Sequence, residues 1–389
     1  MLICLLIYLV ADAGRKGYRL LLEAFWDECL TFDIPLPTPA PVTASAFCQA
    51  RLKIEPELVR HLMQEVAGEF HAVPCPEFLR KGHRVFAVDG AKVSVQRSDE
   101  LFDALGCHDN AHCPQMLVST LYDALAGTIH DVTVAPTHSS ERAELRKMLD
   151  ALAPGDILTL DRGYPSFPIF SELLERGVHF VVRLPTKSTF GPVEDFLAEG
   201  GQDGTVSIQP PPGMRHSHES IELRVVVVHG PGGSSRVLAT DLDPAEFSSD
   251  QLGAIYHLRW QVEELYKLER GNYLGQGQFH AKSLQGLKQE VFALALFINM
   301  TRIFRALAAK DVQQPYEHMT QKASVLAVAA YLTRFLLEKD DQKLARLVRQ
   351  LVTRVSWNIT EPRPDRHYPR RSYKPPPKWT PNGRKGERR

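Results

Sequence analysis

Residues 156–164 read DILTLDRGY, so that a short apolar run ends at Asp161 and a glycine follows within two positions. A run of this length that is closed by turn residues is typical of a buried β-strand. The chain continues with a helical pattern over 166–176 and a second apolar run over 178–184. The order strand, helix, strand predicts a mixed α/β fold, with Asp161 at the end of one of its strands.

Asp89 lies in a similar setting upstream. Residues 85–90 read VFAVDG, which predicts a strand over 84–95 that carries an acid directly after an apolar run. Strand patterns over 116–126 and 128–134 follow, joined by a glycine that predicts a hairpin turn. A carboxylate that ends a wholly apolar run is costly unless a cation compensates it. Other acids in or beside strands are expected to be exposed or in loops, namely Asp123, Asp131, Asp156 and Asp241.

The third candidate acid, Glu263, lies within a helical pattern over 248–272. At about 100° per residue, one polar stripe spans roughly 80° of this helix and consists of Tyr256, Arg259, Glu263, Lys267 and Arg270. A solvated helix face with spaced ion pairs would give the same stripe. Two strand-end aspartates and a helical glutamate, however, suit two Mg²⁺ ions held against a phosphodiester. The pattern therefore indicates phosphoryl transfer on nucleic acid.

These residues resemble the motifs of one family. Tyr256, Arg259 and Glu263 are similar to the Y-x-x-R-x-x-x-E-x-x-x-x-x-x-K signature of DDE transposases of the insertion-sequence family 4. The chain departs from that signature at its last position, where Arg270 replaces the lysine and Lys267 stands one turn earlier. Three further segments resemble the motifs of the two aspartates and of the strand before the glutamate helix: VDG at 88–90, DRGY at 161–164 and ATDL at 239–242.

The resemblance implies a fold and a mechanism. The fold is an RNase H-like core with a β-rich insertion, and the reaction is cleavage at the ends of a DNA element followed by strand transfer. Asp89, Asp161 and Glu263 are then the catalytic acids and the ligands of two Mg²⁺ ions, with Mn²⁺ as a substitute. The residues expected to hold DNA phosphates are Tyr256, Arg259, Arg270, Lys267 and Arg162. The implied partners are double-stranded DNA, both element ends and target, and a second copy of the chain in a synaptic homodimer.

The family also flips a base near the cut, and a stacking side chain holds the extruded base. None of the four tryptophans falls in the expected insertion, so Phe190 or Phe196 is the candidate there, and Trp260 is expected in the core. Two other functions stay open at this point. One is a DNA-binding protein that has lost its chemistry, and the other is an RNase H-like nuclease without strand transfer.

The chain is expected to divide into five segments. These segments are an N-terminal helical segment over 1–83, the first part of the core over 84–186, the β-rich insertion over 187–247, the second part of the core over 248–330, and a helical region with a basic tail over 331–389. Residues 45–51 resemble the N-terminal motif of the family. The first segment is therefore expected to contact transposon-end DNA through Arg51, Lys53 and Arg60, with a purely structural role equally open.

Charge is unevenly distributed in a chain whose formal net charge is zero. Residues 363–389 contain ten Lys/Arg and two acids, so this tail carries a net charge of +8 and the rest of the chain −8. The tail is also rich in proline, which predicts an extended segment that builds no core. It could follow a phosphate backbone with its interleaved aromatic residues, or it could only aid solubility.

The amino terminus is apolar over 2–10 but lacks a basic segment before it and is too short to span a bilayer. A helix packed on the core is expected there, rather than a signal peptide. The six cysteines form no CxxC pair, which favours reduced thiols. We therefore expect a cytoplasmic, nucleoid-associated protein without a membrane partner.

Overall fold

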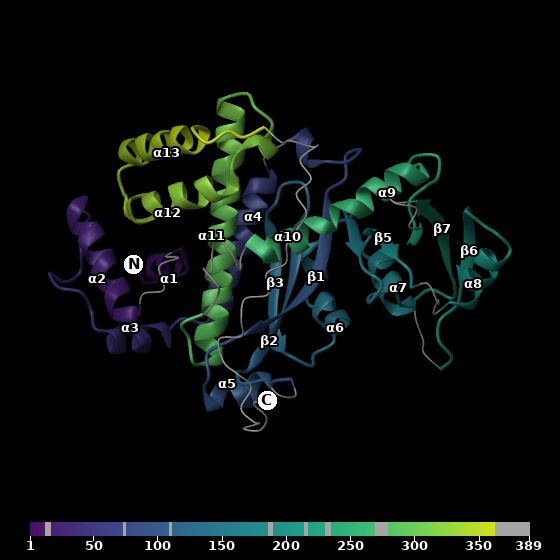
Figure 1. Cartoon of the computed structure of the whole chain (residues 1–389), viewed down its shortest axis with the longest axis horizontal. Coiled ribbons are helices and arrows are strands. Elements are labelled where there is room, and N and C mark those ends of the chain that lie inside the picture. The colour runs from purple at the N-terminus through teal and green to yellow at the C-terminus, as the bar shows by residue number, and fades with distance from the viewer. Residues whose placement is uncertain are drawn as a thin grey trace, which may run out of the picture.

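The computed structural model describes residues 1–11, 17–72, 75–108, 111–185, 190–213, 217–229, 235–268 and 279–361. A helical block occupies one end of the molecule, and a long mixed sheet runs from it to the other end (Figure 1). The predicted mixed α/β character is confirmed.

The sheet has eight strands in the order β3-β2-β1-β4-β5-β8-β7-β6. β4 pairs in parallel with both β1 and β5, and every other neighbouring pair is antiparallel. The strands of the expected insertion extend the core sheet, because β8 pairs with β5. The strands are β1 (Val85–Ser94), β2 (Gln115–Asp123), β3 (Ile129–Pro136), β4 (Ile157–Leu160), β5 (His179–Arg183), β6 (Asp203–Ile208), β7 (Ile221–His229) and β8 (Ser235–Thr240).

The expected helices are present, with some differences. The single helix expected over 248–272 is divided at Arg259 into α9 and α10, and its last four residues lie outside the described residues. Helices α5 and α8 were not predicted. The helices are α1 (Leu2–Ala11), α2 (Tyr18–Thr31), α3 (Ala44–Arg51), α4 (Pro56–Ala72), α5 (Asp99–Leu105), α6 (Glu141–Arg146), α7 (Phe167–Glu175), α8 (Gly191–Ala198), α9 (Ser249–Leu258), α10 (Trp260–Leu268), α11 (Leu284–Asp311), α12 (Gln321–Leu337) and α13 (Asp341–Ser356), with short 3₁₀ turns at Pro76–Phe78, Leu149–Ala151 and Tyr316–His318.

Helix α11 is the centre of the helical block, and α1, α4, α12 and α13 pack around it (Figure 1). In length and composition α11 could cross a membrane, but 83% of its apolar stretch is buried inside the protein, as in the core helix of a globular fold. The apolar amino terminus forms α1 and packs on the same core, where the rings of Tyr8 and Phe25 form a T-shaped pair with centroids 5.2 Å apart. The expectation of a packed helix at 2–10 is confirmed.

The register of the sheet aligns the two aspartates. β1 and β4 pair with Val85 opposite Ile157 and Ala87 opposite Thr159. The same offset, continued along both strands, brings Asp161 beside Asp89. Because parallel neighbours end at the same edge of a sheet, the two carboxylates share one edge.

The strand acids that we expected to be exposed are mostly buried, which corrects that prediction. Asp123, Asp131 and Asp156 are each at most 7% exposed. Each has partners that compensate burial: Asp123 accepts from the backbone of Leu125 and Ala126, Asp131 from both ends of the Arg60 guanidinium, and Asp156 from Ala153 N–H. Alternation along a strand could not reveal this, because both faces of the sheet are covered by helices.

A buried arginine joins the N-terminal helices to α11. The Arg51 guanidinium pairs with Glu290 at 2.9 Å, donates to Gln289 Oε1 at 3.0 Å and donates to the Gly286 carbonyl at 2.8 Å. Arg51 is 5% exposed and Glu290 is fully buried. Arg60 is likewise bound to Asp131. Two of the three basic residues expected to contact DNA from the first segment therefore form internal ion pairs.

We predict that Arg51→Met destabilises the protein by about 3–5 kcal/mol, because it leaves the Glu290 carboxylate buried without its partner. The free energy of unfolding from urea titration measures the effect. The double variant Arg51→Met with Glu290→Gln should recover part of the loss, since no charge then remains buried. Equal stability of Arg51→Met and the wild type would show that the pair contributes nothing.

Candidate active site

Helices α9 and α10 carry the third acid past the edge of the sheet where the two aspartates lie (Figure 1). The side chain of Ser248 caps the first turn of α9 and Gln251 returns the bond, so this helix begins at a fixed point. The Tyr266 hydroxyl of α10 donates to the Asp89 carbonyl at 2.7 Å, which fixes α10 against β1. Glu263, one turn earlier on α10, therefore faces the same edge.

Asp161 is held by α9 and β5. The Tyr256 hydroxyl donates to Asp161 Oδ1 at 3.1 Å, and Arg183 Nη1 lies 3.9 Å from the same oxygen. The Asp161 side chain remains one-third exposed, so solvent or a ligand can reach it. Arg162, its neighbour in sequence, is exposed.

Arg259 connects the three acids. Its Nη2 donates to Glu263 Oε1 at 2.6 Å, and its charge also acts on Asp161 and on Asp89. The residue is only 8% exposed and its guanidinium lies 5.8 Å from the centre of the Tyr256 ring. A buried cation among carboxylates offsets repulsion that would otherwise oppose their assembly.

Asp89 is the most perturbed of the three acids. Its pKa is raised to about 6, mainly by burial and also by the nearby charges of Glu263 and Glu141, while Arg259 opposes them. Glu141 comes so close because residue 90 is a glycine: a Cβ there would lie 3.0 Å from the Glu141 carboxyl carbon. Burial also raises the pKa of Tyr164, which lies near Glu141 and Asp89. The glycine of the VDG motif thus admits a fourth carboxylate beside the site.

The donor set fits a hard divalent cation. Asp89, Asp161 and Glu263 offer carboxylate oxygens, which Mg²⁺ prefers. Burial is the main cause of the raised pKa of Asp89, and a bound cation would favour the charged form of this carboxylate. Within the described residues, no three His, Cys, Asp or Glu side chains are yet gathered closely enough to hold a metal ion. Glu263 is instead paired with Arg259, and Asp161 with Tyr256.

Two expected DNA contacts cannot be placed. Arg270 lies outside the described residues, and so does the side chain of Lys267, although its backbone belongs to α10. Tyr256 and Arg259 lie at the site as expected, but both are mostly buried.

Sequence patterns missed two arginines beside the site. Arg183 of β5 and Arg236 of β8 line a small cavity of about 60 Å³, together with Tyr256, His257, Arg259 and Trp260. Each arginine stands alone in an apolar strand, and only the antiparallel pairing of β5 with β8 brings them together. No local pattern could have revealed this.

The aromatic residues considered for stacking lie differently from our expectation. Trp260 is 44% exposed and donates to Glu264, so the expected core position is wrong. Phe190 and Phe196 pack against the apolar cluster between the sheet and α7. Phe190 lies 5.9 Å from Phe170 between ring centroids.

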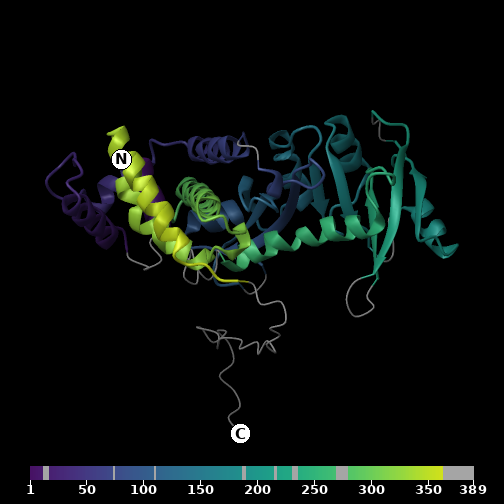
Figure 2. The same cartoon turned by 90° about the horizontal axis from the view of Figure 1, so that it is seen from above.

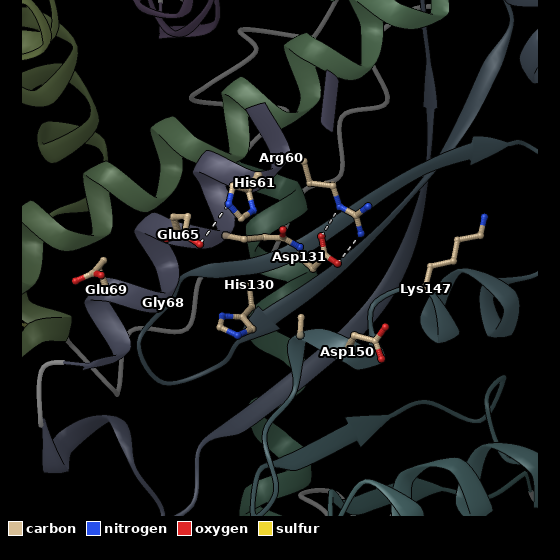
Figure 3. Close-up of a pocket in the computed structure, with 11 residues that line it drawn as sticks. Arg60, His61, Glu65, Gly68, Glu69, His130, Asp131, Lys147 and Asp150 are labelled. Carbon is tan, nitrogen blue, oxygen red and sulfur yellow. Dashed lines mark hydrogen bonds and ion pairs between the residues drawn. The ribbon is translucent and has the colours of Figure 1, made fainter. Parts of the chain in front are cut away.

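A separate cavity of about 580 Å³ lies between α4 and β3 (Figure 3). Its charged groups are largely paired within the protein: Arg60 with Asp131, and His61 with Glu65. Burial and the neighbouring His71 lower the pKa of His130 to about 4, which keeps that imidazole neutral. None of the sequence-derived candidates for catalysis lines this cavity, so it is not the candidate active site.

The raised pKa of Asp89 predicts a pH dependence of stability in metal-free protein. The folded state binds a proton at Asp89 up to about pH 6, whereas an aspartate in the unfolded chain releases it near its ordinary pKa of about 3.9. Stability should therefore fall as pH rises between these values, by on the order of 2 kcal/mol. Urea unfolding at pH 4 to 7, with metal chelated, measures this fall, and Asp89→Asn should remove it. A fall of equal size in Asp89→Asn would assign the titration to another group.

Comparison with known proteins gives three findings. A family model described as the transposase DDE domain matches residues 80–300. The transposase InsG for insertion sequence element IS4 of Escherichia coli (strain K12) is 22% identical over 349 residues, which cover 87% of this chain and 78% of that protein. A piggyBac transposase synaptic complex with hairpin DNA is similar in structure with a TM-score of 0.45 and 11% identity. That match covers 69% of this chain and 57% of the piggyBac chain.

The matched region contains Asp89, Asp161 and Glu263 and spans more than half of the chain. The relative from the IS4 element agrees with the motifs in the sequence. The chain therefore belongs to the DDE transposase family, as an IS4-type member, and its function is that of a metal-dependent DNA transposase.

Proposed function

We propose that this chain cleaves DNA at the ends of an insertion sequence and joins the freed ends to target DNA by a cut-and-paste reaction. The observation that carries the proposal is the position of Arg259, which acts on Asp89, Asp161 and Glu263 at one edge of the sheet. Three acids from two strands and a helix, with arginines beside them, suit catalysis on a phosphodiester.

We also propose that strands β1 to β5 form an RNase H-like core. The support is the order β3-β2-β1-β4-β5, with an antiparallel hairpin of long strands followed by strand, helix, strand. In this proposal β6, β7 and β8 belong to the insertion over 187–247. The segment boundaries at 83, 186, 247 and 330 stay predictions. So does contact of the first segment with transposon-end DNA, where Lys53 remains exposed.

The proposed cofactor is a pair of Mg²⁺ ions, replaceable by Mn²⁺, with Asp89, Asp161 and Glu263 as ligands. Bound there, the ions would stabilise the charge on the attacking and leaving oxygens of the phosphodiester. Glu263 would hold a metal ion through its carboxylate, one oxygen of which accepts from the Arg259 guanidinium at 2.6 Å in this structure. The Arg259 guanidinium is a group that could also bind a phosphate.

The cationic side chains around the acids position the DNA in this proposal. Arg259, Arg183 and Arg236 present guanidinium groups from three elements to one small cavity beside Asp161. Guanidinium groups bind phosphate in a bidentate manner, which fixes its orientation. Arg162 is exposed beside Asp161 and can reach the same backbone. Arg270 and Lys267 remain candidates from the sequence alone.

The proposed partners are duplex DNA, both element ends and target, and a second copy of the chain, because two ends must be brought together. A cytoplasmic location with the nucleoid and the absence of a membrane partner follow from that substrate. The two alternatives differ in their products. An inactive copy would bind DNA without cutting it, and a nuclease would cut without joining.

We predict that Asp89→Asn, Asp161→Asn and Glu263→Gln each abolish cleavage while leaving DNA binding nearly intact, because each keeps the side-chain shape but loses a metal ligand. The substrate is a duplex carrying the DNA that flanks the gene, incubated with and without Mg²⁺. Binding by all proteins without cleavage by any would indicate an inactive copy. Cleavage by the wild type without joined products would favour the nuclease.

We predict that Tyr256→Phe slows single-turnover cleavage by about 10-fold or more, since a hydrogen bond to a charged group contributes about 1.5–3 kcal/mol. The hydroxyl donates to Asp161 Oδ1, and the variant removes only that atom. Tyr331→Phe on α12 is the matched control and should cleave at the wild-type rate. An unchanged rate for Tyr256→Phe would mean that the hydroxyl does not position Asp161 during the reaction.

A further inference from the structure

Helix α13 carries a row of basic side chains. Residues 342–357 contain four Lys/Arg and no Asp or Glu. At about 100° per residue, five residues fall within roughly 80° of one another along the helix. They are Lys343, Arg346, Gln350, Arg354 and Trp357, and we call them the α13 stripe. Trp357 belongs to it because the C-cap residue keeps helical backbone angles.

The opposite face of α13 is packed, which fixes the direction of the stripe. Leu351 and Val355 are at most 1% exposed and lie in the core of the helical block, where α13 packs against α11 and α12. All five residues of the stripe are exposed. Trp357 is 74% exposed, more than any other large apolar side chain among the described residues. The stripe thus faces outward from a helix that cannot rotate.

The cations of the stripe lack acidic partners. Within the described ranges, Lys343, Arg346 and Arg354 form no ion pair, whereas several other exposed arginines do. Examples are Arg19 with Glu23, Arg146 with Glu172 and Arg176 with Asp150. Like charges three or four residues apart on a helix repel each other. A stripe of this kind gains most from an anion with regularly spaced charges.

The location of the stripe favours DNA as that anion. In Figures 1 and 2 the carboxyl end of α13 lies on the side of the molecule along which α9 and α10 run. The stripe covers about 21 Å of helix axis, which would face several phosphates spaced about 3.4 Å apart along the axis per strand. The basic sequence of 363–389 follows directly.

We propose that the α13 stripe binds the phosphate backbone of duplex DNA outside the catalytic site, with Trp357 packing against the sugar–phosphate chain. The inference rests on the proposed function, and it adds a contact surface remote from the three acids. An exposed indole suits this role because it offers apolar area and one N–H donor. The stripe holds DNA that extends from the cleavage site, so it determines affinity and not the rate of the chemical step.

The test measures binding of the full chain to a labelled duplex of about 30 base pairs as a function of NaCl concentration. Lys343→Gln with Arg346→Gln should lower the slope of log affinity against log salt by about 2, since each lost phosphate contact removes about 0.9. Trp357→Ala should weaken binding without changing the slope, because no charge is lost. Single-turnover cleavage with protein in excess over Kd should proceed at the wild-type rate in both variants.

A matched control removes two exposed charges elsewhere. Arg80→Gln with Arg176→Gln changes residues that precede β1 and β5, at the edge of the sheet opposite to Asp161. This control should keep the wild-type slope. An identical slope in the control and in the Lys343/Arg346 variant would overturn the inference. Failure of the wild type to bind any duplex would instead overturn the proposed function.

The same variants test a competing use of the surface. Lys343 and Arg346 also line a cavity of about 750 Å³ between α13 and Phe32–Pro35. Sedimentation of each variant without DNA determines the oligomeric state. A change of that state, together with an unchanged salt slope, would assign the stripe to a contact between copies and overturn the DNA contact.

Discussion

The burial of a carboxylate beside other carboxylates at one edge of the sheet is the constraint on which the rest of the site depends. Burial is the main cause that raises the pKa of Asp89, the charges of Glu263 and Glu141 act in the same direction, Arg259 opposes them, and the resulting pKa is about 6. Arg259 makes the arrangement possible, because one buried guanidinium interacts with all three catalytic candidates. Protonation of a carboxylate is favoured at such a site, and binding of a metal cation is favoured for the same reason.

Rigid neighbours hold the acids in place against this repulsion. Asp89 and Asp161 belong to adjacent strands whose pairing leaves no freedom of register. Glu263 is fixed more loosely, through the Tyr266 hydroxyl on the Asp89 carbonyl and the packing of α10 on β1. The two aspartates thus have fixed positions, and the helix that carries the glutamate completes the site. Arg259, between α9 and α10, keeps helical backbone angles, so it reaches Glu263 as an i,i+4 pair on one helix face.

Much of this arrangement could be predicted from local sequence, because local patterns record burial. An apolar run that ends in an acid predicted both aspartate positions, and the stripe on the glutamate helix predicted Tyr256 and Arg259. Glu141, Arg183 and Arg236 were missed because pairing between distant segments brings them to the site. The buried partners of Asp123 and Asp131 were missed for the same reason. Trp260 was misplaced because a tryptophan in an amphipathic helix gives no sign of which side the helix presents.

The distribution of charge follows from the two tasks of the molecule. A site that gathers carboxylates repels a DNA backbone, so affinity has to come from cations placed elsewhere. The arginines of β5, β8 and α9–α10 supply charge next to the acids, but they are few and partly committed to ion pairs. The C-terminal part of the chain concentrates basic residues instead, over α13 and over the tail from 363 onward. In the proposed function, a formal net charge of zero is compatible with affinity for DNA, because the sequence concentrates basic residues apart from the three acids.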